Sequence, residues 1–193
     1  MQIPSLSLSQ GQLLWAVSLG QEPSPEVRDR ARYLALQGIP RPASAPGPGK
    51  GQRVVYDFDD LILVGLALLA LAEGYKPRTM KEYLVQERRR FLVEVHSAWE
   101  SLPEGMLADD DILKRNGVVI YEDDYYVRLS GRGRGEEAKL EFILPEAGPP
   151  YMAEVMPGEE PAKVFSLKFW MPRWVAWALR APAKPPGPRK ALA

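Results

Sequence analysis

The stretch RARYLALQGIPRP, residues 30–42, ends a helix and opens a loop, and it decides how the first half of the chain is organised. Ala31 and Leu34 are apolar at helical spacing, whereas Arg32 and Tyr33 fall on or near the open side of the same helix. Gly38 is the residue type that most often follows a helix end, and prolines come soon after it. The stretch therefore predicts the end of an amphipathic helix with a basic outer face.

The residues before this stretch predict a second helix close by. Ser24 is suited to cap the helix that ends at Gly38, and Pro25 fits its first position. Another helix is predicted over SQGQLLWAVSLG, residues 9–20, with Ser9 as its cap and Gly20 at its end. Two helices joined by a few residues form the helix-turn-helix pattern.

The residues after the stretch continue as loop, strand and helix. IPRPASAPGPGKG, residues 39–51, is a long Pro/Gly connection, and QRVVYDF, residues 52–58, is strand-like. Asp59 is expected to cap a third helix that runs to Ala72, and a long fourth helix is predicted from Pro77 to Glu100. Pro103 and Gly105 mark a change of composition, and we place a domain boundary there.

The second half of the chain has mainly strand signals. NGVVIYEDDYYVRLSG, residues 116–131, predicts a hairpin that turns at residues 122–124. AKLEFILP (138–145) and AKVFSLKF (162–169) predict two further strands, and PRWVAWALR (172–180) a short aromatic helix. The expected fold is α+β, with a helical domain at residues 1–76, a long helix at 77–104, a small β-rich domain at 105–180 and a flexible tail at 181–193.

Composition limits the chemistry that the chain can perform. The 193 residues carry no net charge and no cysteine, which excludes disulfides and thiolate metal sites. The single histidine, His96, is expected to be structural, and we predict no enzyme activity, cofactor or metal. The longest apolar run, residues 61–72, is shorter than the roughly 20 residues that span a bilayer, so a cytoplasmic protein without a membrane partner is expected. Abundant Pro and Arg with little Asn and Thr are typical of a thermophile or a GC-rich genome.

Three motifs follow one another in an order that resembles a known family. ARYLALQGIP, residues 31–40, carries Arg32 and Tyr33 followed by Gly-Ile-Pro; YDFDDL, residues 56–61, and LAEGYKPRTMKEYL, residues 71–84, come next. This order is similar to the DNA-binding domain of the MerR family of transcription regulators, which is a winged helix-turn-helix. Leu34 and Ala35 stand where the family usually has Tyr and Glu, and the Pro-rich wing is longer than usual.

The resemblance implies sequence-specific binding of double-stranded DNA. Arg28 or Arg30 would reach base edges, Arg32 and Tyr33 would hold the phosphate backbone, and the wing would add Lys50 and Arg53. It also implies a homodimer whose long helices pair through an apolar stripe; the alternative is that the C-terminal β part folds back over this stripe and leaves a monomer. The stripe residues are Leu84, Phe91, Val95 and Leu102. RNA polymerase and a small apolar effector are further partners that this class of protein suggests.

Other interpretations of the same residues stay open. The chain could instead be a protein-interaction module built on a winged helix, with an aromatic C-terminal docking face. The aromatic residues there suit either an effector pocket or the core of a small domain. They are Tyr121, Tyr125, Tyr126, Phe165, Phe169, Trp170, Trp174 and Trp177. The acidic runs at residues 109–111 and 122–124 lack EF-hand spacing, and GPGKGQ, residues 47–52, lacks the Ser or Thr of a phosphate-binding loop.

Overall fold

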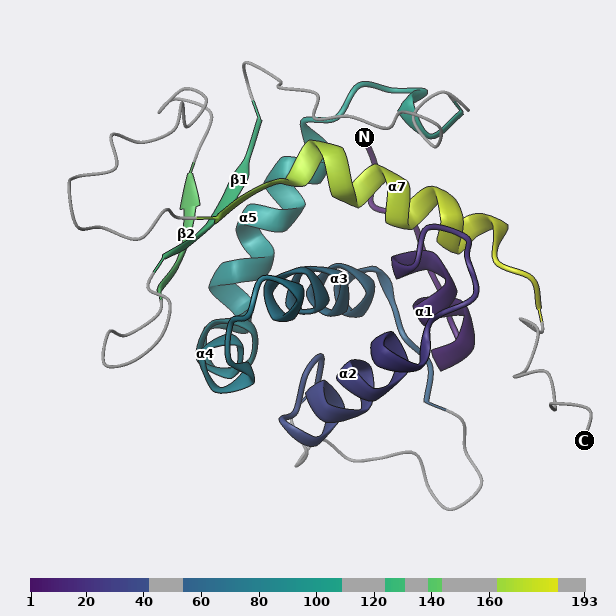
Figure 1. The fold of residues 1–193 in the computed structure, drawn as a ribbon. Coiled ribbons are helices and arrows are strands. Elements are labelled where there is room, and N and C mark those ends of the chain that lie inside the picture. Colours follow the sequence, from purple (N-terminus) through teal and green to yellow (C-terminus); the bar gives the residue numbers. More distant parts are fainter. Residues whose placement is uncertain (42–53, 109–123, 131–138, 144–162, 184–193) are drawn as a thin grey trace, which may run out of the picture.

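A computed structural model describes residues 1–41, 54–108, 124–130, 139–143 and 163–183. The described chain is mostly helical, with one small antiparallel sheet (Figure 1). The first helices are α1 (Gln10–Val17), α2 (Pro25–Leu36) and α3 (Phe58–Ala72). They are followed by α4 (Pro77–Lys81), a π-helical turn (Glu82–Gln86), α5 (Arg88–Glu100) and a short 3-10 turn (Met106–Ala108). The last elements are β1 (Tyr126–Ser130), β2 (Lys139–Ile143), β3 (Lys163–Ser166) and α7 (Leu167–Arg180).

Local capping residues fix where the first helices begin. The hydroxyl of Ser9 accepts a hydrogen bond from the backbone N–H of Gln12, and that of Ser24 accepts one from Val27, as the sequence predicts. The cap predicted for α3 is wrong, because Asp57 and not Asp59 accepts from the backbone N–H of Asp60, at 2.9 Å. The earlier start brings the buried Phe58 ring into the helix.

The predicted helix from Pro77 to Glu100 is not continuous. α4 passes into the π-helical turn, and a bend at Glu87 separates that turn from α5. Glu87 stands at the N-cap of α5 without a side-chain capping bond. The apolar spacing holds on both sides of the bend, so a periodicity argument alone does not detect it.

The sheet has the order β2-β1-β3, and both pairings are antiparallel. The strand predicted at residues 138–145 is confirmed by β2, whereas the strand predicted at 162–169 is confirmed only in its first half, because β3 ends at Ser166. Ser166 caps α7 by accepting from the N–H of Phe169, so α7 begins five residues before the predicted start at Pro172. Of the predicted hairpin, the arm before residue 124 lies outside the described residues.

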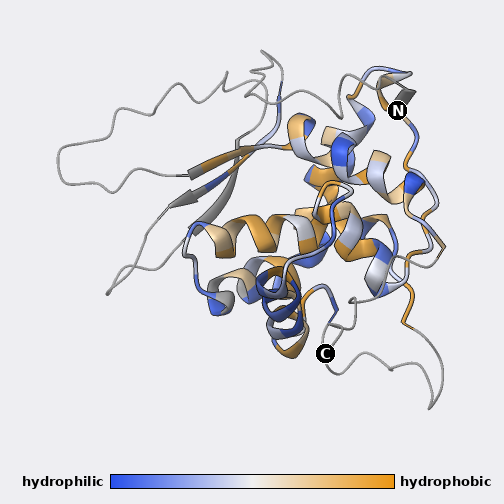
Figure 2. Ribbon diagram, turned by 45° about the vertical axis from the view of Figure 1, so that its right-hand side comes forward, coloured by the Kyte–Doolittle hydropathy of each residue, from blue (hydrophilic) through white to orange (hydrophobic). Residues whose placement is uncertain are grey.

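Helix α7 belongs to the same core as the N-terminal helices. It packs against α1, α3 and α5, with α3 in the middle of the helices (Figure 1). Trp174 is 1% exposed and lies against Gly65, where a Cβ atom would come within 2.7 Å of the indole ring. Glycine therefore permits the close approach of α3 and α7. The apolar ribbon segments face one another in this region (Figure 2).

This packing corrects the predicted separation into an N-terminal domain and a β-rich domain at residues 105–180. A single cluster of buried apolar side chains includes residues of α1, α2, α3, α5, β1 and α7. The sequence prediction failed because a short aromatic helix next to strands gives no indication of which surface it covers. Of the predicted α+β fold, the structure confirms a mainly helical chain with one small antiparallel sheet.

The predicted dimer stripe is buried within one chain. Leu84 and Val95 are completely buried, and Phe91 and Leu102 are each 3% exposed. All four belong to the common core, which α7 completes, so they do not form a free apolar surface. The prediction that these side chains make the contact between two copies is therefore corrected. Within the described residues, moreover, no helix combines the length and apolar character that crossing a bilayer requires.

A buried carboxylate joins the residues before the sheet to the start of α7. Asp124 is 1% exposed, and it accepts hydrogen bonds from the Ser166 hydroxyl and from the backbone N–H of Lys168. Burial raises the pKa of the Asp124 carboxyl above its ordinary value, although these hydrogen bonds oppose the rise. The folded state thus binds this proton more tightly than the unfolded state does.

This shift gives a prediction for the effect of pH on stability. Because the folded pKa is raised, the stabilising contribution of the protonated group is present at low pH and is lost as pH rises through the folded pKa. Replacing Asp124 by Asn should remove that loss, so the variant should lose less stability than the wild type between about pH 4 and pH 7. Urea unfolding at several pH values measures this. Parallel stability curves for the two proteins would contradict the role given to Asp124.

Candidate functional site

Helix α2 carries four of the predicted DNA contacts, of which Arg30 also lines a cavity described below. Ala31 and Leu34 are buried toward the core, while the Arg32 side chain is 76% exposed and Tyr33 is 49% exposed. The side chains of Arg28 and Arg30 are about one-third exposed, at 31% and 34%. The structure therefore places these four residues on one solvent-facing helix. The other two predicted contacts, at positions 50 and 53, lie outside the described residues.

Each arginine of α2 has an acidic partner. Arg28 pairs with Glu22 at 3.1 Å and Arg32 with Asp29 at 3.4 Å; Arg30 pairs with its neighbour one turn earlier, Glu26, at 2.5 Å. The positive charge expected on α2 is thus neutralised locally by these carboxylates. The pairing of Glu22 with Arg28 was not predicted, because Glu22 lies before the helix begins. Exposed pairs of this kind contribute at most about 1 kcal/mol each, so a phosphate group is able to compete with the carboxylates.

The C-terminal end of α2 is also apolar on its outer side. Leu36 is 73% exposed and follows Tyr33 along the helix. Val54 and Val55, which precede α3, are 40% and 49% exposed. The surface of this part of the molecule thus combines paired charges with large apolar side chains.

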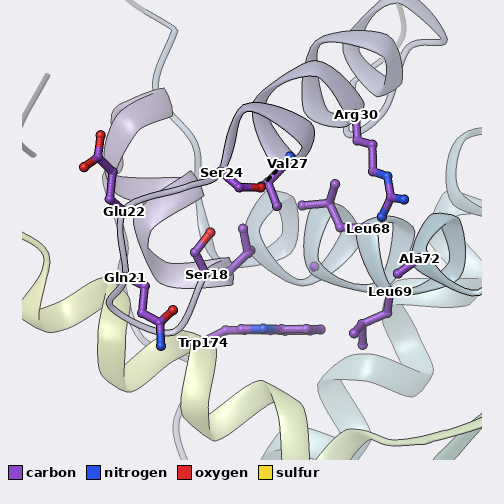
Figure 3. A pocket seen from close by; sticks show the side chains of 12 residues that line it. Ser18, Gln21, Glu22, Ser24, Val27, Arg30, Leu68, Leu69, Ala72 and Trp174 are labelled. Atoms are coloured by element: carbon purple, nitrogen blue, oxygen red, sulfur yellow. Dashed lines mark hydrogen bonds between the residues drawn. The ribbon is translucent and has the colours of Figure 1, made fainter. Parts of the chain in front are cut away.

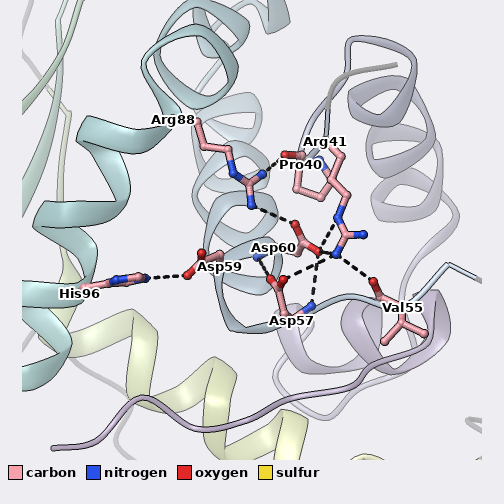
Figure 4. Close-up of polar contacts among 8 residues, drawn as sticks. All are labelled: Pro40, Arg41, Val55, Asp57, Asp59, Asp60, Arg88 and His96. Carbon is pink, nitrogen blue, oxygen red and sulfur yellow. Dashed lines mark hydrogen bonds and ion pairs between the residues drawn. The ribbon is translucent and has the colours of Figure 1, made fainter. Parts of the chain in front are cut away.

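A buried carboxylate holds together the two ends of the predicted wing. Asp60 is completely buried, and both Arg41 and Arg88 donate to it (Figure 4). Nε of Arg41 lies 2.9 Å from Oδ2 of Asp60, and Nη2 of Arg41 donates to the carbonyl of Val55, also at 2.9 Å. Arg41 stands just before residues 42–53 and Val55 just after them, so one guanidinium links both ends of that segment. The hydrogen bond to Asp60 raises the pKa of Arg41, which keeps it charged.

The same carboxylate connects the two ends of the predicted wing to α5. Arg88, at the start of α5, lies 3.3 Å from Oδ1 of Asp60 and also donates to the carbonyl of Pro40. Farther along α5, His96 shares a 2.7 Å hydrogen bond with Asp59 (Figure 4). Sequence reasoning missed Arg41 and Arg88 as partners of Asp60, because they are 19 and 28 positions away from it.

The start of the segment that leads into α3 is fixed by a backbone bridge. Leu8 and Tyr56 exchange two backbone hydrogen bonds, each 2.8 Å long, immediately before α1 and α3 respectively. The Tyr56 side chain packs against the core, and its burial raises the pKa of the phenol. The Tyr56 side chain thus holds the residues before α3 against the helices.

A cavity of about 330 Å³ opens between α1, α2, α3 and α7. Its apolar lining comes mainly from α3, α1 and α2, with Trp174 of α7 at its base (Figure 3). The apolar lining residues are Val17, Val27, Gly65, Leu68, Leu69, Ala72 and Trp174. The polar lining residues are Ser18, Gln21, Glu22, Ser24 and Arg30. The sequence contained no signal for this cavity, because its walls come from four separate elements.

The described residues contain no group of three or more His, Cys, Asp or Glu side chains placed to hold a metal ion. The acidic runs at residues 109–111 and 122–123 lie outside that description. Comparisons of the chain with protein-family models, with curated proteins and with solved structures give no match. The geometry of the chain itself is therefore the basis for a functional proposal.

Proposed function

We propose that the chain binds double-stranded DNA as a transcription regulator of the MerR type, with a winged helix-turn-helix in which α2 is the recognition helix. The observation that carries the proposal is the pair α1–α2, which packs on α3 through buried apolar residues and turns Arg32 and Tyr33 outward. A helix with exposed arginines fits the major groove and donates to phosphates or to guanine edges.

The network around Asp60 supports the same proposal from a second direction. A wing functions only if its base is held firmly against the helices that dock on DNA. Arg41 links the chain before residues 42–53 to the chain after them, and Arg88 ties this junction to α5. The proposed DNA-binding unit is thus built on a rigid base. A homodimer on DNA would need a surface other than the four buried stripe residues.

A salt titration tests the proposal. Binding to duplex fragments should weaken steeply as the salt concentration rises, because each phosphate contact releases counterions. Replacing Arg32 by Gln should lower affinity for all sequences and reduce the salt slope by about one. Arg90→Gln is the matched control, since Arg90 is an arginine on α5 that also has an acidic partner three residues earlier and a side chain that is 86% exposed. Equal effects of the two substitutions would overturn the assignment of α2 as the DNA-contacting helix.

A second function, docking of a protein partner, is favoured by one observation. The arginines of α2 are paired, and Leu36 and Tyr33 beside them are exposed. For this function we propose a docking surface at the end of α2 and not on the C-terminal aromatics, because Trp174 is buried and Trp170 and Trp177 pack against the core. Lack of duplex binding at physiological salt, together with a partner whose capture requires Leu36, would favour this function.

A further inference from the structure

We propose that the cavity between α1, α2, α3 and α7 binds a small apolar monocarboxylate, and that the bound ligand weakens DNA binding. The first half of the proposal stands on the cavity alone. The second half rests on the proposed function, because it concerns arginines that are assigned to DNA contact. The inference starts from the shape and lining of the cavity shown in Figure 3.

The walls of the cavity suit a compact apolar group. Leu68 and Leu69 are only partly buried on the side of α3 that faces the cavity, and Val17 and Val27 complete the apolar lining from α1 and α2. Its volume of about 330 Å³ lies at the lower end of the range for small-molecule sites. A small ring or branched chain bound against these walls would remove apolar surface of both ligand and protein from water, and this burial favours binding.

The rim of the cavity suits a single carboxylate. Arg30 contributes a guanidinium, and Ser24 marks the N-terminus of α2, where the helix dipole favours an anion although the N–H of Val27 already donates to the Ser24 hydroxyl. The Ser18 hydroxyl oxygen is buried at the wall and has no hydrogen-bond partner in the described structure. This oxygen is covered by protein atoms, so a ligand carboxylate in the cavity would meet Arg30 and not Ser18.

The acidic side chains already at the rim, Glu26 and Glu22, do not prevent this anion from binding. Glu26 is the current partner of Arg30, and its side chain is 69% exposed, so it is able to turn to water when a ligand takes its place. Glu22, the one acidic residue of the lining, is paired with Arg28 at 3.1 Å. Bidentate donation by arginine to a carboxylate in a partly enclosed site is stronger than the exposed pair that it replaces.

The position of the cavity links the ligand to the DNA-contacting helix. Arg30 is itself a proposed DNA contact, and Glu22 orients a second one, Arg28. A carboxylate that holds Arg30 in the cavity withdraws it from the duplex. By thermodynamic reciprocity, DNA then weakens binding of the carboxylate by the same factor.

Cyclohexanecarboxylate is the probe, and its neutral isostere cyclohexanecarboxamide is the control ligand. Both are titrated into the full chain by calorimetry and by tryptophan fluorescence. We expect saturable binding of the carboxylate in the range of about 0.1–10 mM and at least tenfold weaker binding of the amide. Arg30→Gln should abolish that preference, whereas Arg32→Gln, on the same helix but outside the cavity, should leave it unchanged. Ala72→Phe, a substitution at an exposed lining position, should block both ligands.

The outcomes separate this inference from the proposed function. Equal binding of carboxylate and amide, or a preference that survives Arg30→Gln, overturns the carboxylate site even if Ala72→Phe proves unstable. A second titration measures duplex affinity with and without saturating carboxylate, and a several-fold loss is expected. Carboxylate binding by a chain that never binds duplex leaves the site standing and removes the proposed function. Duplex affinity that is unaffected by bound carboxylate overturns the coupling alone.

Discussion

Replacing Asp60 by Asn is expected to lower the free energy of unfolding by about 3 kcal/mol. The Asp60 carboxylate is completely buried and is shared by Arg41 and Arg88. A neutral amide leaves both guanidinium groups without their anionic partner, and it also places N–H donors against N–H donors. The expected loss lies at the lower end for broken buried ion pairs, because the side chains of Arg41 and Arg88 are 43% and 24% exposed and water is able to reach them.

Asp57→Asn is the matched control for this measurement. Asp57 lies three residues earlier, also contacts Arg41, and caps α3, but its side chain is 55% exposed. Asn is an equally good capping residue, so this variant should lose less than about 1 kcal/mol. Urea unfolding of the wild type, Asp60→Asn and Asp57→Asn measures the two losses of stability. If Asp57→Asn is as destabilising as Asp60→Asn, the buried position of Asp60 is not what makes the network important.

Replacing Trp174 by Ala should cost about 3–5 kcal/mol, because a large and almost completely buried ring is lost. The ring is 1% exposed and lies between α7 and Gly65 of α3. Its removal leaves a cavity that Gly65 has no side chain to fill. Because α7 also contacts α1 and α5, the loss should appear throughout the N-terminal helices as one cooperative transition.

Leu179→Ala is the control for Trp174→Ala. It changes a large apolar residue of the same helix that is 56% exposed, so its effect should stay within about 0.5 kcal/mol. Hydrogen exchange on the wild type and the Trp174→Ala variant shows where stability is lost. A loss of protection confined to α7 and the sheet would contradict a common core and would restore the two-domain arrangement predicted from the sequence.

Signals that act within one or two helical turns were readable from the sequence. Ser9 and Ser24 cap α1 and α2, and Gly38 follows α2 with a positive φ of 83°. The outward position of Arg32 and Tyr33, the strand β2 and the start of β3 were also predictable. In each case the deciding interaction joins residues that are close in the chain, or follows from the period of the element.

Contacts between distant segments were decided only by the tertiary structure. The pairing of Asp60 with Arg41 and Arg88, the approach of Trp174 to Gly65 and the four-sided cavity each bring together side chains from different elements. The apolar stripe on α5 was correctly predicted to need a partner, but its periodicity does not say whether that partner is a second copy or a helix later in the same chain. Here α7 supplies it, because burying both apolar faces against each other removes them from water within one molecule.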